Sequence, residues 1–311
     1  MDPRAVSEIL KVAHDLETKG FSHVKRLMKD PFVLGTMFHN PDPRESQICE
    51  LTAARLGVPV VDLSWRNVES KDTESLISEL EMSAKSVDLL LTAFSSKETF
   101  GEGRNLTEKF AAASKTPLLS LHDDIYNWQT ALTHLMGFQS QVGNLSGKQV
   151  VVSWGFGSNF SNPAVAHGLI VSSALAGADV RVVAPPDFPV LNRVKRDAAQ
   201  SPGLVKETSD FQNAFEDADA VYVGNWFRLD DFNHPERNVN FVSKYTDWYL
   251  SETLLPETCV VSTDPSIQSG LTVSPEILKS QRCVNSSWQT RRVNILAATI
   301  HYILYMEKSI I

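Results

Sequence analysis

The chain has 311 residues, of which 42% are hydrophobic and 21% are charged, and its net charge is −8 at pH 7. This length predicts two domains of ordinary size, and the composition is that of a soluble globular protein. An acidic balance without a Lys/Arg cluster argues against a nucleic-acid-binding surface.

The three cysteines, Cys49, Cys259 and Cys283, are an odd number without metal-ligand spacing. They favour a reducing compartment and argue against a disulfide framework. The N-terminal segment is charged and amphipathic, unlike a signal peptide, and no apolar run is long enough to cross a membrane. We therefore expect a cytoplasmic protein that binds neither membrane nor nucleic acid.

In the first half, apolar residues at helical spacing predict a helix over 7–19. Short apolar runs predict buried strands over 33–38, 58–63, 87–91 and 117–121. The loop after the first of these strands reads HNPDPRES and leads into a helical pattern. Acidic residues at that point are compatible with a helix N-cap and with the helix dipole.

The clearest unit of the chain spans 147–188 and reads as strand, helix and strand. Val150–Ser153 is a β-branched run, Pro163 can begin a helix, and Ala164–Ala176 carries apolar residues at helical spacing. Val180–Val183 is the second strand. Parallel strands joined by a helix predict an α/β domain with ligands at the carboxyl ends of its strands.

A dinucleotide-binding loop is the first functional hypothesis for this unit, because Gly155 and Gly157 lie between a strand and a helix. The third glycine of that fingerprint would fall on Phe160, where the helix must pack closely on the strand. The spacing therefore argues against a nicotinamide or flavin site.

Further along, helical patterns predict helices over 191–199 and 211–215, and 218–223 leads into a strand. A last helix is predicted over 291–306, with an apolar face that includes Ile295, Leu296, Ile300 and Ile303. The alternation of strands and helices over the whole chain predicts two α/β domains, each with a largely parallel sheet and helices on both faces.

The unit at 147–188 carries four distinctive features: Gly147-Lys148, Asn162 in the loop, the helix start at Val165-Ala166-His167-Gly168 and the strand GADVRVVAPPDF. In these features it resembles the second domain of the aspartate/ornithine carbamoyltransferases. The pair Ser153-Trp154 and the long loop before Asn162 are most similar to the N-acetylornithine and N-succinylornithine branch. The resemblance extends over nearly the whole chain.

This resemblance implies two doubly wound domains with parallel sheets, and a shallow knot in the C-terminal domain. The donor domain would comprise 1–137 and be completed by the helix at 288–311, and the acceptor domain would comprise 138–287. Family members bind carbamoyl phosphate and an amino acid, need no metal or cofactor, and form trimers.

The family's phosphate-gripping loop, S-T-R-T-R, corresponds here to a divergent stretch in which Arg44 is kept. Asp42 and Glu45 replace hydroxyl residues, and two carboxylates oppose a doubly charged phosphate unless they are neutralised or turned away. A simple helix N-cap remains the alternative interpretation of this loop. The arginine that ends the family's next strand is replaced by Thr92-Ala93-Phe94.

Three more donor contacts follow from the resemblance. Gln129 is the one survivor of the family's H-P-x-Q motif, and Tyr126 takes the histidine position. A tyrosine can donate a hydrogen bond to a carbonyl oxygen, although Tyr126 and Trp128 are equally compatible with core residues at a helix start. Arg292 falls on the arginine that binds the donor in the family. Arg44, Gln129, Tyr126 and Arg292 are therefore the expected catalytic residues.

The resemblance also implies a set of substrate-binding residues: Lys71, Asn162, Trp226, Arg228, Thr263 and Asp264. Lys71 would reach into a neighbouring subunit, or else be an ordinary solvated lysine. Arg228 indicates an acceptor more acidic than ornithine, unless it pairs with the aspartates that follow it. Asp264 is compatible with orienting an acceptor amine and with capping a turn before proline.

The resulting hypothesis is an enzyme that transfers a carbamoyl group from carbamoyl phosphate to the amine of an amino acid or derivative. Two alternatives stay open at this point: a related enzyme with a different, less anionic donor, and an inactive paralogue that binds a metabolite or assembles with an active relative.

Overall fold

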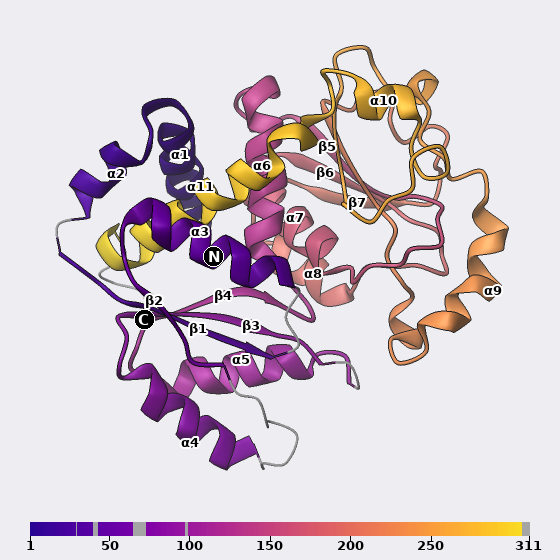
Figure 1. Ribbon diagram of the computed structural model, residues 1–311. Coiled ribbons are helices and arrows are strands. Elements are labelled where there is room, and N and C mark those ends of the chain that lie inside the picture. The colour runs from indigo at the N-terminus through magenta and orange to yellow at the C-terminus, as the bar shows by residue number, and fades with distance from the viewer. Residues whose placement is uncertain (29, 40–42, 65–72, 97–98, 307–311) are drawn as a thin grey trace. The chain divides into compact units, whose positions relative to one another are not determined.

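The computed structural model describes residues 1–306 except 29, 40–42, 65–72 and 97–98. The chain divides into two compact units (Figure 1). The first, called the N-terminal unit here, comprises Glu8–Gln129 and Gln289–Ile311. The second, the central unit, comprises Met1–Ser7 and Thr130–Trp288. In the described part of the chain, no helix has both the length and the apolar content needed to cross a membrane.

The N-terminal unit contains a parallel sheet in the order β2-β1-β3-β4. Its strands are β1 (Leu34–His39), β2 (Val60–Asp62), β3 (Leu89–Phe94) and β4 (Leu118–Asp123). Its helices are α2 (Phe21–Leu27), α3 (Pro43–Leu56), α4 (Thr73–Ala84) and α5 (Glu102–Ala113). Most of α1 (Pro3–Lys19) and of α11 (Trp288–His301) also belongs to this unit. A π-helical turn (Tyr302–Met306) prolongs α11. Helices α4 and α5 lie on one side of the sheet, and α3 and α11 lie on the other (Figure 1).

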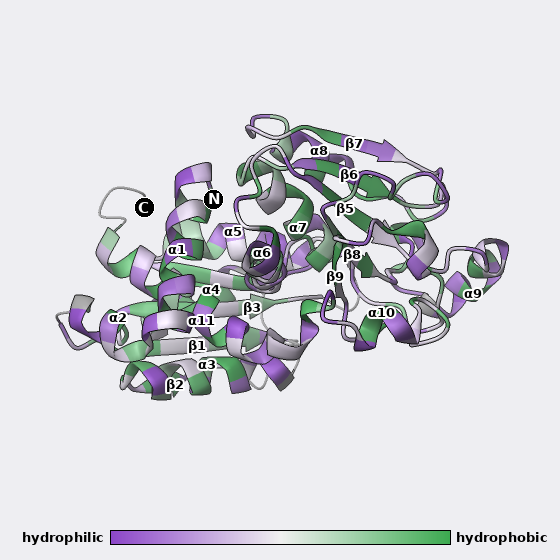
Figure 2. Cartoon of the chain, turned by 90° about the horizontal axis from the view of Figure 1, so that it is seen from above, coloured by the Kyte–Doolittle hydropathy of each residue, from purple (hydrophilic) through white to green (hydrophobic). Residues whose placement is uncertain are grey.

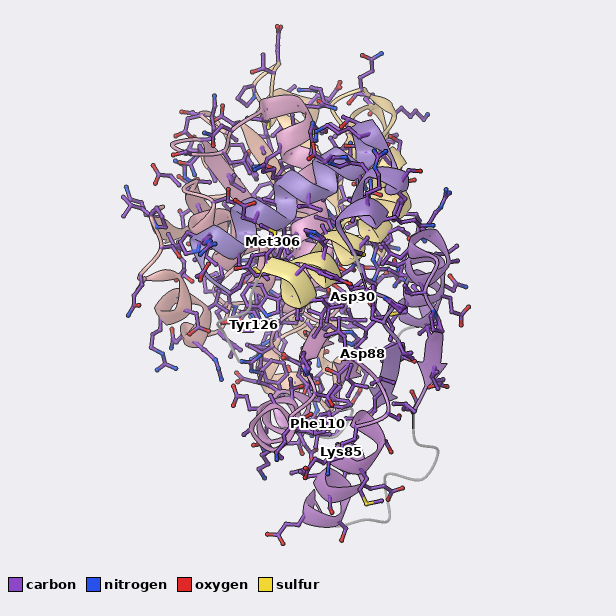
Figure 3. All side chains as sticks on the ribbon, turned by 90° about the vertical axis from the view of Figure 1, so that its left-hand side faces the viewer. Asp30, Lys85, Asp88, Phe110, Tyr126 and Met306 are labelled. Carbon is purple, nitrogen blue, oxygen red and sulfur yellow. The ribbon has the colours of Figure 1, made fainter. Side chains whose placement is uncertain are left out.

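The apolar core of this unit lies between the sheet and helices α4 and α5. Phe110 of α5 is fully buried in it, and its place on the helix is labelled in Figure 3. The strands contribute Met37, Leu90 and Phe94, and α4 contributes Leu76 and Leu80. Burying each such side chain stabilises the fold by about 1.5–3 kcal/mol. On the opposite face of the sheet, α3 carries Glu45 and α11 carries Arg292, and these two polar side chains pair with each other.

The central unit contains a second parallel sheet in the order β7-β6-β5-β8-β9. Its strands are β5 (Gln149–Trp154), β6 (Asp179–Val183), β7 (Val205–Thr208), β8 (Ala220–Gly224) and β9 (Val260–Thr263). Its helices are α6 (Trp128–Val142), α7 (Ala164–Leu175), α8 (Asn192–Ala198), α9 (Val239–Val242) and α10 (Pro275–Lys279). Short 3₁₀ turns cover 229–231, 235–238, 243–245, 252–254 and 284–287.

Helix α7 explains why the βαβ pattern was so clear in the sequence. Nearly all of its residues are buried, and it packs against β5 and β6. Its apolar character is visible in Figure 2. Gly177 follows the helix at φ +84°, a left-handed conformation that glycine adopts without strain and that ends helices.

The predicted fold class is confirmed, because both sheets are parallel and both alternate with helices. The helix predicted over 211–215 is wrong: this segment forms turns, and Phe211 and Phe215 pack edge to face with ring centroids 5.1 Å apart. The half-exposed edge strand β7 was not predicted. The expected knot stays a prediction.

Candidate functional site

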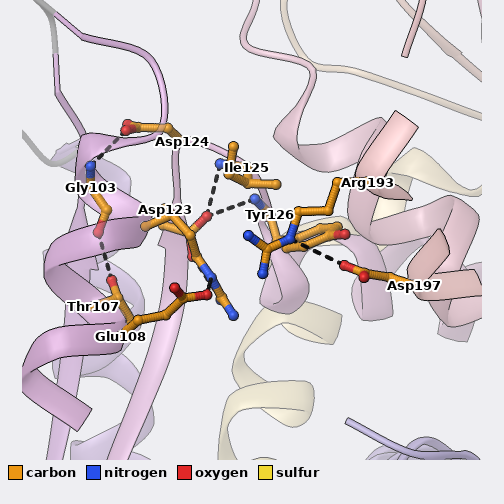
Figure 4. Close-up of polar contacts among 10 residues, drawn as sticks. Gly103, Thr107, Glu108, Asp123, Asp124, Ile125, Tyr126, Arg193 and Asp197 are labelled. Carbon is orange, nitrogen blue, oxygen red and sulfur yellow. Dashed lines mark hydrogen bonds and ion pairs between the residues drawn. The ribbon is translucent and has the colours of Figure 1, made fainter. Parts of the chain in front are cut away.

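The turn between β4 and α6 is held by two adjacent buried carboxylates, Asp123 and Asp124 (Figure 4). Asp123 Oδ1 accepts hydrogen bonds from the backbone N–H groups of Ile125, at 2.8 Å, and Tyr126, at 2.9 Å. Its Oδ2 lies 3.1 Å from Nη1 of Arg104. This carboxylate therefore fixes the backbone from which the side chain of Tyr126 projects.

Asp124 performs a similar role for the loop that leads into α5. Its carboxylate accepts backbone N–H groups from Ser96 (2.8 Å), Gly101 (3.1 Å) and Gly103 (2.7 Å). Burial raises the pKa of Asp124 although these three hydrogen bonds oppose the shift. The two aspartates thus join the end of β4, the start of α5 and the turn before α6 into one hydrogen-bonded corner.

Tyr126 is 1% exposed, and its ring stacks on Trp128 at a centroid distance of 4.6 Å. Its position in the N-terminal unit is labelled in Figure 3. Trp128 is the first residue of α6. The geometry therefore agrees with the interpretation of Tyr126 as an aromatic core residue at a helix start, and a hydrogen-bonding role for its hydroxyl stays a prediction.

Gln129 and Arg292, two of the expected donor contacts, lie together. Gln129 is 5% exposed and Arg292 is 1% exposed. The Gln129 amide donates to the backbone carbonyl of Arg292 at 2.7 Å, and its oxygen accepts from Arg292 Nε at 3.1 Å. The amide thus fixes the guanidinium on α11 relative to the start of α6.

Glu45 of α3 pairs with the same guanidinium, since Arg292 Nη2 lies 2.9 Å from Glu45 Oε1. Glu45 is 4% exposed, so this is a buried ion pair. His122, at the end of β4, brings its Nδ1 to 3.9 Å from Glu45 Oε1. The sequence singled out Glu45 as a substitution that opposes phosphate and gave no role to His122, because no sequence signal places either residue beside Arg292.

Cys49 follows Glu45 by one helical turn on α3 and is fully buried. Burial, and next the charge of Glu45, raises the pKa of this thiol far above its usual range. Cys49 is therefore a neutral thiol at pH 7 and lacks the thiolate character of a nucleophile.

Three further residues that the sequence singled out belong to the N-terminal unit. Arg44 is an exposed residue of the first turn of α3. Asp42 and Lys71 lie outside the described residues.

In the central unit, Asn162 and Trp226 are both engaged in local structure. Asn162 Oδ1 accepts the backbone N–H of Ala164 at 2.8 Å, at the start of α7. Trp226 is 1% exposed, and its indole N–H donates to the carbonyl of Phe188 at 3.0 Å. Both residues hold loops at the carboxyl ends of strands, which is where ligands bind in such sheets.

Arg228 is held by several neighbours at once. Its Nη1 donates to Asp231 Oδ2 at 2.8 Å, and its Nε donates to the carbonyl of Asp187 at 3.1 Å. Its guanidinium carbon lies 3.6 Å from the ring centroid of Phe241. This geometry favours the structural interpretation of Arg228, because its charge is already compensated by Asp231.

Thr263 and Asp264 lie at the carboxyl end of β9. Thr263 Oγ1 accepts from Asn285 Nδ2 at 2.7 Å. Asp264 Oδ1 accepts from the backbone N–H of Ser266 at 2.8 Å, and its Oδ2 from the hydroxyl of Tyr222 at 3.3 Å. Asp264 therefore caps its turn, as the simpler interpretation expected.

The structure adds a buried network that the sequence did not indicate. His134 Nδ1 lies 2.6 Å from Ser262 Oγ, and this hydroxyl donates to Asn285 Oδ1 at 2.9 Å. Since Asn285 takes the hydroxyl proton, Ser262 is an acceptor toward His134 and is not an activated nucleophile. The partners are too far apart in sequence for any spacing rule to reveal them.

Among the residues that the structure describes, no group of three or more His, Cys, Asp and Glu side chains is arranged to hold a metal ion.

The structure brings Gln129 and Arg292 together with Glu45 in one unit. It places Thr263 beside Asp264 in the other unit, and Asn162, Trp226 and Arg228 after other strands.

No family model matches the chain. Individual curated proteins do match: the N-acetylornithine carbamoyltransferase of Xanthomonas campestris pv. campestris is 25% identical over 289 residues, covering 85% of each chain. The ornithine carbamoyltransferase of Rhodococcus jostii is 23% identical over 259 residues, covering 82% of this chain and 77% of its own.

Solved structures agree on the fold. A crystal structure of N-acetyl-L-ornithine transcarbamylase superposes with a TM-score of 0.81 at 21% identity, covering 95% of this chain and 94% of its own. Another, of acetylornithine transcarbamylase complexed with acetylcitrulline, gives a TM-score of 0.79 at the same identity, over 95% of this chain and 94% of its own. By sequence, the chain is similar to N-acetylornithine and ornithine carbamoyltransferases, and it shares the fold of N-acetyl-L-ornithine transcarbamylase.

Proposed function

We propose that the protein transfers a carbamoyl group from carbamoyl phosphate to the amine of an amino acid or an amino-acid derivative. The amine nitrogen attacks the carbonyl carbon, the bond from that carbon to the phosphate oxygen breaks, and the amine loses a proton. The products are a ureido compound and inorganic phosphate. The observation that carries this proposal is the buried Arg292–Gln129 pair in a chain whose relatives are named as carbamoyltransferases.

On the donor side, Arg292 would stabilise the negative charge that develops on the donor, and Gln129 would hold the guanidinium in place for it. We assign Arg44 an auxiliary anion contact, and Tyr126 a hydrogen bond to the carbonyl oxygen. Such a reaction depends on holding two reactants close together and on preorganised charge, which fits a site with a fixed, buried guanidinium.

On the acceptor side, we propose that Thr263 and Asp264 contact the amino acid at the end of β9. Asn162, Trp226 and Arg228 would shape the surrounding loops, and Arg228 would reach an acidic group of the acceptor only by exchanging Asp231 for it. Lys71 would contribute from a neighbouring subunit.

The test is an assay of ureido product by mass spectrometry, with carbamoyl phosphate and a panel of amines that includes ornithine, N-acetylornithine, N-succinylornithine and aspartate. Phosphate release alone is insufficient, because carbamoyl phosphate also hydrolyses without enzyme. Replacing Arg292 by Gln should lower kcat/KM by at least about 100-fold, which is the scale of removing one charged transition-state contact. An absence of ureido product with every amine would contradict the proposal.

A second candidate is the same transfer from a less anionic donor, and it is favoured by one observation: Glu45 already neutralises Arg292. In that case the amine panel would give product only with a carbamoyl donor that lacks phosphate.

We also propose that the protein is a cytoplasmic homotrimer. The free state of the three cysteines and the trimers expected by resemblance support this. Light scattering should give a particle mass of three chains of 34.5 kDa each; a monomer would leave Lys71 without the neighbouring site that we assign to it.

A further inference from the structure

The charge balance around Arg292 is unusual for a site that is meant to hold a phosphate. Glu45 lies on α3 and Arg292 on α11, and both side chains are at most 4% exposed. Glu45 Oε1 lies 2.9 Å from Arg292 Nη2. A buried guanidinium attracts an anion strongly, and here the protein itself supplies that anion.

The carboxylate of Glu45 is only half used by the described residues. Its Oε1 accepts from Arg292, whereas its buried Oε2 has no hydrogen-bond partner among them. The buried Nδ1 of His122, 3.9 Å from Oε1, likewise has no hydrogen-bond partner within the described part of the chain. Buried polar atoms are normally paired, so a purely structural ion pair does not account for these two atoms, one on Glu45 and one on a residue that approaches it. An N–H group of a ligand would satisfy Oε2.

We propose that Glu45 determines the charge selectivity of the donor site: it acts as a built-in anion on Arg292 and disfavours doubly negative ligands. A phosphate dianion that approaches Arg292 must either share the guanidinium with Glu45 or displace this carboxylate into a buried position without a partner. A ligand with an N–H donor and little negative charge meets neither obstacle. The inference rests on the proposed function, because it treats carbamoyl phosphate as one of the anions that reach this site.

The experiment is calorimetric titration of the purified full-length protein with inorganic phosphate and with carbamoyl phosphate. Glu45→Gln keeps the size and the acceptor oxygen for Arg292 but removes the charge. It should bind both anions at least about tenfold more tightly, since one nearby negative charge is gone. Glu45→Asp keeps the charge and should bind as weakly as the unmodified protein.

Glu50→Gln is the matched control, because Glu50 lies on the same helix but is exposed. It should leave both affinities within twofold. Equal affinities of the Glu45→Gln variant and the unmodified protein would overturn the inference, and so would an absence of anion binding by both.

If the Glu45→Gln variant is too unstable for titration, Glu45→Ser can be tested by thermal unfolding. Phosphate should raise its midpoint by clearly more than it raises the midpoint of the unmodified protein, because the stabilisation by a ligand grows with its affinity for the folded state. Equal shifts would overturn the inference.

The outcomes separate this inference from the proposed function. Tight anion binding by Glu45→Gln without ureido product from any amine would leave the inference standing and contradict the function. Ureido product from the unmodified protein would support the function. If its KM for carbamoyl phosphate then equalled that of Glu45→Gln, the inference would be contradicted.

Discussion

Gln129 and Arg292 hold each other through two hydrogen bonds of opposite direction: the amide N–H group donates to the arginine backbone, and the amide oxygen accepts from the guanidinium. The two residues are 163 positions apart in the chain. Helix α11 thus carries a buried cation whose orientation is set by the neutral amide of Gln129.

Replacing Gln129 by Ala removes both hydrogen bonds and leaves part of the guanidinium without its acceptor. We expect a loss of about 2–4 kcal/mol in the free energy of unfolding, because one of the bonds involves a charged group. Urea denaturation measures this loss. Gln141→Ala is the control, since its amide makes an exposed hydrogen bond to the carbonyl of Gln281 and should change stability by less than about 1 kcal/mol. Equal effects of the two substitutions would contradict the role given to Gln129.

Asp124→Asn tests the corner that joins β4, α5 and α6. The amide retains one acceptor oxygen, whereas the carboxylate serves three backbone N–H groups. We expect a loss of about 2–4 kcal/mol in urea denaturation, because at least one buried N–H group then faces an amide donor. Asp210→Asn is the control: this side chain accepts from the backbone N–H and the side-chain amide of Asn213, but it is exposed, so water can replace the acceptor that an asparagine lacks. A fully stable Asp124→Asn variant would show that the loop finds other acceptors.

Arg228→Ala distinguishes the structural role of this residue from acceptor binding. Loss of the contacts to Asp231, Phe241 and the Asp187 carbonyl should lower the free energy of unfolding by about 1–3 kcal/mol. The exposed Arg237 provides the control, and its replacement by Ala should stay within about 0.5 kcal/mol. Unchanged stability together with a raised KM for the acceptor amine would instead assign Arg228 to substrate binding.

His301 gives a prediction about pH. It is 6% exposed at the end of α11, and burial lowers its pKa in the folded state. In the unfolded chain a histidine has a pKa of about 6.5. As the pH falls toward that value, the unfolded chain therefore binds more protons at His301 than the folded protein does. The protein should lose stability as the pH falls from about 7.5 to about 5.5, by no more than about 1.4 kcal/mol per pH unit from this group.

His301→Phe keeps a ring to stack on Tyr305, whose ring centroid lies 5.8 Å away, and removes the titration. Urea denaturation at the two pH values should show a smaller loss for this variant than for the unmodified protein. His14→Gln, at an exposed position, should show the unmodified dependence. Parallel pH profiles of the His301→Phe variant and the unmodified protein would contradict the assignment.

Local sequence patterns were sufficient for most of the fold, for a physical reason. Central parallel strands are buried on both faces, so β5 and β8 contain continuous apolar runs. The ends of β5 were predicted within one residue. Edge strand β7 reads Val-Lys-Glu-Thr and is half exposed, so it has no such run and was missed. Phe211 and Phe215 had helical spacing, but they pack on each other and Phe211 packs on Trp248 from a series of turns.

For the candidate site, the sequence by itself predicted Gln129 and Arg292 as donor contacts and Glu45 as a carboxylate that opposes phosphate, and these roles stay predictions. Only the tertiary structure decided that Glu45 and Arg292, 247 residues apart, form one buried ion pair. The reason is that Coulomb attraction and desolvation depend on distance and burial, which the folded packing of α3 and α11 sets and which no local pattern encodes.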